Sequence, residues 1–122
     1  MKVISTDKAP GAIGPYSQGY IVGDMVFTSG QIPIDPATGE MAEGIDAQTE
    51  QSCKNVMAIL EAAGSGADKV IKTTCFLADM ADFAEFNAEY ALHFTGLPAR
   101  ECVQVAALPK GARVEVSVIA ER

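Results

Sequence analysis

The segment 113–120 constrains the fold more than any other part of the chain, because its two sets of alternate residues differ in character. One set is uniformly apolar and consists of Val114, Val116 and Val118. The other set is mixed: Arg113, Glu115, Ser117 and Ile119. Since successive side chains of a strand point to opposite faces of its sheet, the pattern predicts a strand with one face in a core. Its second face mixes charged, polar and apolar residues, which is typical neither of a core nor of a solvated surface. A subunit interface is the simplest explanation of this mixture.

The spacing of apolar residues in the rest of the sequence predicts one α+β domain over residues 1–122. Strands are expected at 2–6, 20–22, 25–28, 70–77, 100–106 and 113–120. Helices are expected from Asp46 to Ala63 and from Asp82 to about Phe94. Asp46 can cap the first helix, and Asp82 with Glu85 resembles a capping box for the second. Six strands and two helices predict a two-layer sandwich, in which both helices cover one face of a mixed sheet.

Composition excludes several functional classes. The chain carries nine Lys and Arg against sixteen Asp and Glu, a formal net charge of -7, so a nucleic-acid partner is not expected. Its three cysteines form no CxxC pair, and no secretory leader is apparent, which predicts a reduced, cytoplasmic protein. No apolar run approaches the roughly 20 residues of a membrane helix, so no membrane partner is expected.

Two charged residues lie in strand-like segments among residues that should be buried, Arg100 and Glu115. A buried charge is costly unless it has a partner or a task. Arg100 can hold a carboxylate through two parallel hydrogen bonds, or it can be a surface residue paired with an acid such as Glu101. Burial would raise the pKa of Glu115 and suit it to proton transfer, whereas strand alternation equally permits an outward, solvated side chain.

Four further residues have a structural and a functional interpretation. Cys102 shares a face with Arg100, but with no histidine in a recognisable triad context a small buried thiol is the default. Asn87 lies on the apolar stripe of the second helix and can bind a loop or a ligand. Tyr16 and Ser29 each lie beside a turn that contains Gly or Pro, where the backbone can approach a ligand closely. The structural interpretation is that Tyr16 covers the hydrophobic core and that Ser29 is a turn residue. One histidine and no clustered ligands predict no metal site.

Several segments together resemble the RidA (YjgF) family, whose name stands for reactive intermediate deaminase A. The resemblance spans nearly the whole chain and rests on motifs that occur in order. They are Ile13-Gly14-Pro15-Tyr16-Ser17-Gln18, Thr28-Ser29-Gly30-Gln31-Ile32-Pro33, Val70-Ile71-Lys72-Thr73-Thr74, Asp82-Phe83, Asn87, Pro98-Ala99-Arg100-x-Cys102 and Leu108-Pro109-Lys110-Gly111.

The resemblance implies a chorismate-mutase-like sandwich that forms a homotrimer, with clefts between neighbouring subunits. The implied activity is hydrolysis of 2-imino acids and their enamine tautomers, such as 2-aminoacrylate and 2-aminocrotonate, to 2-oxo acids and ammonia. Pyridoxal-phosphate enzymes release such imines, and the family itself uses no metal or cofactor. The implied partners are small 2-imino and 2-oxo carboxylates and further copies of the chain.

The resemblance also implies roles for individual residues. Arg100 would hold the substrate carboxylate, the Cys102 carbonyl would accept a hydrogen bond from the imine nitrogen or the attacking water, and Glu115 would position that water and shuttle a proton. Tyr16, Ser29 and Asn87 would complete the pocket, with the Gly30 backbone close by.

Some positions depart from the family pattern and bear on which imine is preferred. They are Glu101, Gln104, Ala107 and the short loop 95–97. Two other functions are weighed against it: a binding or sensor protein for small 2-oxo or amino acids, which uses the same Arg100 pocket without turnover, and a translation-inhibiting ribonuclease. The acidic balance and the lack of an aromatic and basic patch oppose the ribonuclease.

Overall fold

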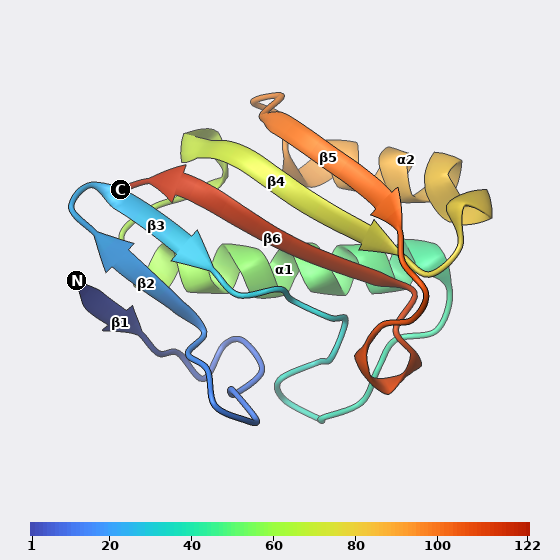
Figure 1. Cartoon of the computed structure of the whole chain (residues 1–122), viewed down its shortest axis with the longest axis horizontal. Coiled ribbons are helices and arrows are strands. Elements are labelled where there is room, and N and C mark those ends of the chain that lie inside the picture. The colour runs from blue at the N-terminus through green and yellow to red at the C-terminus, as the bar shows by residue number, and fades with distance from the viewer.

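One six-stranded sheet of order β1-β2-β3-β6-β4-β5 organises the computed structural model, which describes residues 1–122 (Figure 1). The strands are β1 (Lys2–Ile4), β2 (Gly19–Val22), β3 (Met25–Thr28), β4 (Val70–Leu77), β5 (Ala99–Gln104) and β6 (Val114–Glu121). The helices are α1 (Ile45–Ala62) and α2 (Phe83–His93). Only β4 and β5 pair in parallel, and α2 makes the crossover between them. The predicted element order and the mixed sheet are thus confirmed.

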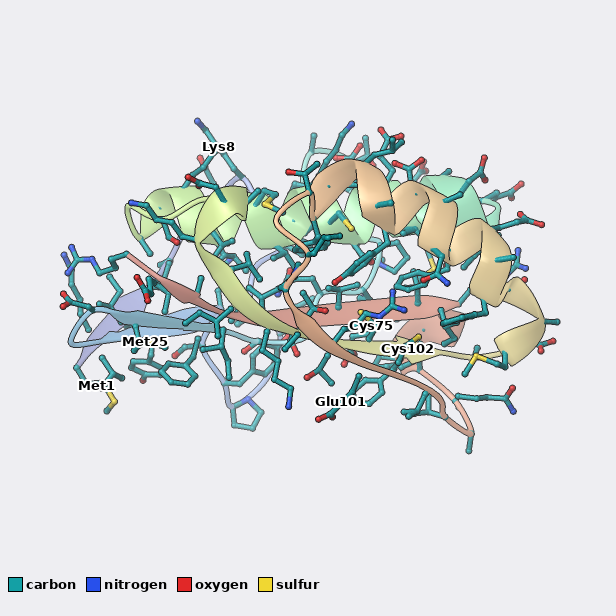
Figure 2. All side chains as sticks on the ribbon, turned by 90° about the horizontal axis from the view of Figure 1, so that it is seen from above. Met1, Lys8, Met25, Cys75, Glu101 and Cys102 are labelled. Carbon is teal, nitrogen blue, oxygen red and sulfur yellow. The ribbon has the colours of Figure 1, made fainter.

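Both helices lie on one face of the sheet, as predicted (Figure 2). The core between the two layers contains 19 buried residues from both helices and from the strands. Val114, Val116 and Val118 of β6 all belong to it, so the apolar set of that strand does face the helices. Neither helix combines the length and the apolar character that crossing a membrane requires.

The helix starts differ from the capping predictions. Gly44, with φ of 88°, occupies the N-cap of α1, while Asp46 lies inside the first turn and caps nothing. Asp82 precedes α2 but makes no capping hydrogen bond. Its carboxylate instead accepts two hydrogen bonds from the Arg113 guanidinium, at 3.2 and 2.7 Å. Asp82 therefore forms a bidentate ion pair with Arg113 instead of a helix cap. This ion pair holds the start of α2 against the start of β6.

The sheet face opposite the helices carries exposed apolar side chains. On β1, β2 and β3 they are Val3, Tyr20, Val22 and Phe27, and on β5 Val103, each between 37 and 51 % exposed. An apolar patch that extends over several strands marks an interaction surface more often than a free one. The mixed second face of β6, with Glu115 and Ile119, belongs to this same open face.

Asn55 of α1 fixes the segment that follows β3. Its buried side-chain amide donates hydrogen bonds to the carbonyls of Ile32 and Ile34, at 3.2 and 2.9 Å. Asn55→Ala would leave both carbonyls without this donor, and we expect it to lower the free energy of unfolding by about 2 kcal/mol. Urea denaturation at fixed protein concentration measures the change.

Lys54→Ala is the matched control, because Lys54 lies one residue earlier on α1 and forms only an exposed ion pair with Glu50. That change should cost about 0.5 kcal/mol or less. Equal losses in the two variants would mean that the Asn55 amide does not anchor the segment.

Candidate active site

Arg100 lies on β5, at the edge of the sheet, and points toward α2. One of its terminal nitrogens, Nη1, donates to Asn87 Oδ1 at 2.7 Å. The two side chains line a pocket of about 380 Å³ together with Tyr90, Phe94 and residues of the 97–98 turn. The expectation that Arg100 is surrounded by buried residues is wrong, because β5 is an edge strand and most of it is exposed. The guanidinium is therefore open to a ligand from solvent.

Cys102 lies on the same face of β5 as Arg100, as the spacing predicted. It pairs in register with Cys75 of β4, and Figure 2 shows both cysteines between the sheet and α2. The Cys102 thiol is half-buried, and this burial raises its pKa. The lone histidine, His93, is bonded to Glu89 rather than to a cysteine. A thiol with a raised pKa and no base is a poor nucleophile.

Glu115 belongs to a second cluster of predicted residues. It lines a pocket of about 350 Å³ with Tyr16, Ser29, Gly30 and Pro109. Burial raises the pKa of the Glu115 carboxyl, and no side-chain or backbone donor of the chain bonds it. A carboxyl group that is half-buried, without a partner and easier to protonate than usual is suited to exchange a proton with a bound molecule.

The backbone at Gly30 approaches Glu115 so closely that a side chain at position 30 would displace the Glu115 carboxyl. A Cβ atom at this position would lie 2.6 Å from Glu115 Cδ. The neighbouring Ser29 hydroxyl donates to the Ser17 carbonyl, so its own donor is already used. Tyr16 is 55 % exposed and lines the mouth of the pocket, so its default interpretation as a lid on the core is wrong.

The structure separates these residues into two half-sites on opposite faces of the sheet. We call Asn87, Arg100 and Cys102 the Arg100 half-site, and Tyr16, Ser29, Gly30 and Glu115 the Glu115 half-site. Arg100 pairs with Thr73 of β4, which faces the helices, whereas Glu115 pairs with Phe76, three residues further along β4. Residues separated by an odd number of positions along a strand point to opposite faces of the sheet, so Phe76 and Glu115 face away from the helices. One chain therefore does not bring Arg100 and Glu115 into one pocket.

Sequence reasoning missed two contributors. Pro109 lines the Glu115 pocket, and Lys110 beside it adopts a left-handed backbone with φ of 58°. Both belong to the motif Leu108-Pro109-Lys110-Gly111, and nothing in the sequence of this motif indicates that Pro109 and Glu115 line one pocket. Tyr90 of α2 is buried in the core and also lines the Arg100 pocket.

Two departures from the family pattern, Glu101 and Gln104, make contacts outside both half-sites, whereas Leu97 of the short loop 95–97 lines the Arg100 pocket. The Glu101 carboxylate pairs with Lys72 at 2.6 Å on the open face of the sheet, away from Arg100 (Figure 2). Gln104 Oε1 accepts a hydrogen bond from the Met80 amide at 2.7 Å. Glu101 therefore does not neutralise Arg100. No group of three or more His, Cys, Asp or Glu side chains converges as metal ligands would.

Comparison with known proteins gives one consistent result. Residues 6–122 match the profile of the family described as Endoribonuclease L-PSP. A 2-iminobutanoate/2-iminopropanoate deaminase of Salmonella typhimurium is 53 % identical over 99 % of this chain and 98 % of its own length. The crystal structure of the YjgF gene product of Escherichia coli superposes with a TM-score of 0.97 at 49 % identity, covering 100 % of this chain and 99 % of that one.

A second solved relative, TdcF of Escherichia coli with bound serine, superposes equally well. Its TM-score is 0.97 at 48 % identity, and the match covers 100 % of this chain and 99 % of that one. Similarity of this extent covers both half-sites and every element of the sheet.

Proposed function

The chain belongs to the endoribonuclease L-PSP family, which includes the RidA/YjgF deaminases, and we propose that it hydrolyses 2-imino acids to 2-oxo acids and ammonia. The substrates are 2-iminopropanoate and 2-iminobutanoate with their enamine tautomers, 2-aminoacrylate and 2-aminocrotonate. The acting unit is the whole domain, residues 1–122, in the reducing cytoplasm, where the three unpaired cysteines stay thiols.

The working form is a trimer of chorismate-mutase-like subunits whose open sheet faces pack against one another. Two observations support this assembly. The open face carries the apolar patch described above, which would be covered. The two half-sites lie on opposite faces of one chain, and a second copy is what can bring the Arg100 half-site of one chain to the Glu115 half-site of another.

The reaction adds water to an electrophilic carbon, so it needs no covalent nucleophile. Arg100 grips the carboxylate of the imino acid through its planar fork and orients the C=N bond. The Glu115 carboxylate takes a proton from water as its oxygen attacks C2, and it passes this proton to the imine nitrogen, which gives the tetrahedral amino alcohol. Glu115 then takes the proton of the new hydroxyl and delivers it to the nitrogen as the C–N bond breaks, so that C2–O becomes the carbonyl of the 2-oxo acid and ammonia leaves. The Cys102 carbonyl accepts a hydrogen bond from the nitrogen or the water, while Tyr16, Ser29 and Asn87 line the cleft.

The observation that carries this proposal is the combination of a solvent-open arginine without a carboxylate partner and a half-buried glutamate whose pKa burial raises. The test generates 2-aminoacrylate from serine, or 2-aminocrotonate from threonine, with a pyridoxal-phosphate dehydratase. We expect the purified protein to accelerate release of the 2-oxo acid well above the spontaneous rate. Binding of 2-oxobutanoate without acceleration would instead identify a binding protein.

Gly30→Ala tests the contact that shapes the Glu115 half-site. The added Cβ must displace the Glu115 carboxyl, and a shift of about 1 Å can cost up to about 10²-fold in turnover. We expect a large fall in kcat for 2-aminocrotonate with retained folding, judged by circular dichroism.

Gly11→Ala is the control for Gly30→Ala, since a Cβ at Gly11 would meet nothing within 4 Å. It should leave kcat unchanged. Equal turnover in both variants would show that the Gly30 backbone does not fix the position of Glu115.

A further inference from the structure

Arg100 differs from the paired cations of the chain in having no carboxylate partner. Arg113 pairs with Asp82, Lys54 with Glu50 and Lys72 with Glu101. Arg100 has only the hydrogen bond to the neutral Asn87 amide. A long, exposed side chain held by one neutral contact samples many rotamers, and most of these rotamers would turn the guanidinium away from the orientation that binds a carboxylate. Some other contact must therefore hold it for a bidentate grip.

Aromatic rings on α2 supply that contact. The Arg100 Cζ atom lies 4.9 Å from the ring centroid of Tyr90, 5.6 Å from that of Phe83 and 6.0 Å from that of Phe86. All three distances are within the range of a cation–π interaction. The rings lie at helical spacing, so one face of α2 presents them together.

Tyr90, the nearest ring, is itself held from two sides. It is 8 % exposed and packs between Phe86 and Phe94, at ring distances of 5.5 and 4.6 Å. Its hydroxyl is 2.7 Å from Thr73 Oγ1. Thr73 is the register partner of Arg100 on β4. The ring is thereby tied to the sheet beside the strand position that carries Arg100.

We propose that Tyr90 is a positioning residue: its ring, with those of Phe83 and Phe86, forms a platform that fixes the guanidinium plane of Arg100, and Thr73 locks the platform. A guanidinium has five N–H donors. The cation–π contacts are not hydrogen bonds and Asn87 accepts only from Nη1, so Nε and Nη2 keep donors free for a carboxylate. The catalytic importance of the platform rests on the proposed function.

The platform has a kinetic signature. Tyr90→Leu removes the ring and should raise KM for the imino acid by about tenfold, the scale of a partly desolvated cation–π contact, with a smaller change in kcat. Tyr90→Phe keeps the ring but loses the hydroxyl that bonds Thr73, so its KM should fall between those of wild type and Tyr90→Leu. Thr73→Val breaks the same hydrogen bond from the other side and should have a similar effect. Val56→Ala, a core change on α1 at a residue that does not line the Arg100 pocket, should lower the melting temperature without raising KM.

The deciding experiment replaces the side chain by a free ion. Arg100→Ala leaves the platform intact, so millimolar guanidinium should bind there, shift the Tyr90 ring resonances in NMR spectra and restore part of the lost activity. Methylammonium, which lacks the planar fork, should restore none. Adding Tyr90→Leu to Arg100→Ala should abolish both guanidinium effects.

The outcomes separate the two proposals. Tyr90 shifts without recovered activity would support the platform and contradict the carboxylate clamp of the proposed function. Folded Arg100→Ala protein that shows neither shifts nor recovery overturns the platform. If Tyr90→Leu does not fold, Thr73→Val combined with Arg100→Ala takes its place, and undiminished guanidinium binding there would contradict the lock.

Discussion

Arg100→Ala should lower kcat/KM for 2-aminoacrylate and 2-aminocrotonate by about 30-fold to a few thousandfold, because the substrate carboxylate would lose its bidentate, charge-assisted partner. This range corresponds to about 2–5 kcal/mol of lost binding in the transition state. Arg100→Lys restores the charge but not the fork, so most of the loss should persist. The dehydratase-coupled assay measures both variants.

Arg122→Ala controls for the loss of an arginine as such. Arg122 lies at the C-terminus, where its guanidinium donates to the Ala63 carbonyl, outside both half-sites. Its removal should leave imine hydrolysis unchanged. If Arg100→Ala retained full activity, no carboxylate clamp could reside at that position.

Glu115→Gln should reduce kcat by about 10²–10⁴-fold and change KM little, because an amide keeps the shape of the side chain but carries no proton between water and nitrogen. In the wild-type protein kcat should fall on the acid side with a midpoint above the ordinary glutamate pKa, since burial raises the pKa of Glu115. The pH profile of residual Glu115→Gln activity should lack this limb. An unchanged profile would assign the proton transfer to another group.

The same substitution should stabilise the protein. With its raised pKa, the folded Glu115 holds a proton to higher pH than the unfolded chain does. The free energy of unfolding therefore declines as pH rises from the unfolded pKa through the folded pKa. At pH 7 the melting temperature of Glu115→Gln should exceed that of wild type, and the difference should vanish below about pH 4. A less stable variant at pH 7 would contradict this sign.

The sequence was most informative where local pattern and tertiary environment agree. Alternation along β6 predicted both its buried and its mixed face, because one side packs on helices and the other lies on the open face. The helix expected from Asp82 to about Phe94 extends from Phe83 to His93, and the strands expected at 20–22 and 25–28 are β2 and β3.

Features set by long-range contacts could not be predicted in this way. Apolar residues flank Arg100, but β5 forms the edge of the sheet and exposes them, a consequence of strand order rather than of composition. Asp82 has the spacing of a cap but bonds Arg113, which is 31 residues away. That Arg100 and Glu115 lie on opposite faces follows only from the register of β4 with its two neighbours.

The shared site is tested most directly by mixing two inactive variants. Arg100→Ala chains keep an intact Glu115 half-site, and Glu115→Gln chains keep an intact Arg100 half-site. After joint unfolding and refolding at equal amounts, a site built from two chains should be intact in about a quarter of cases, so about a quarter of wild-type activity should return. Each variant refolded alone should stay inactive. A mixture no more active than its components would contradict a site that two copies share.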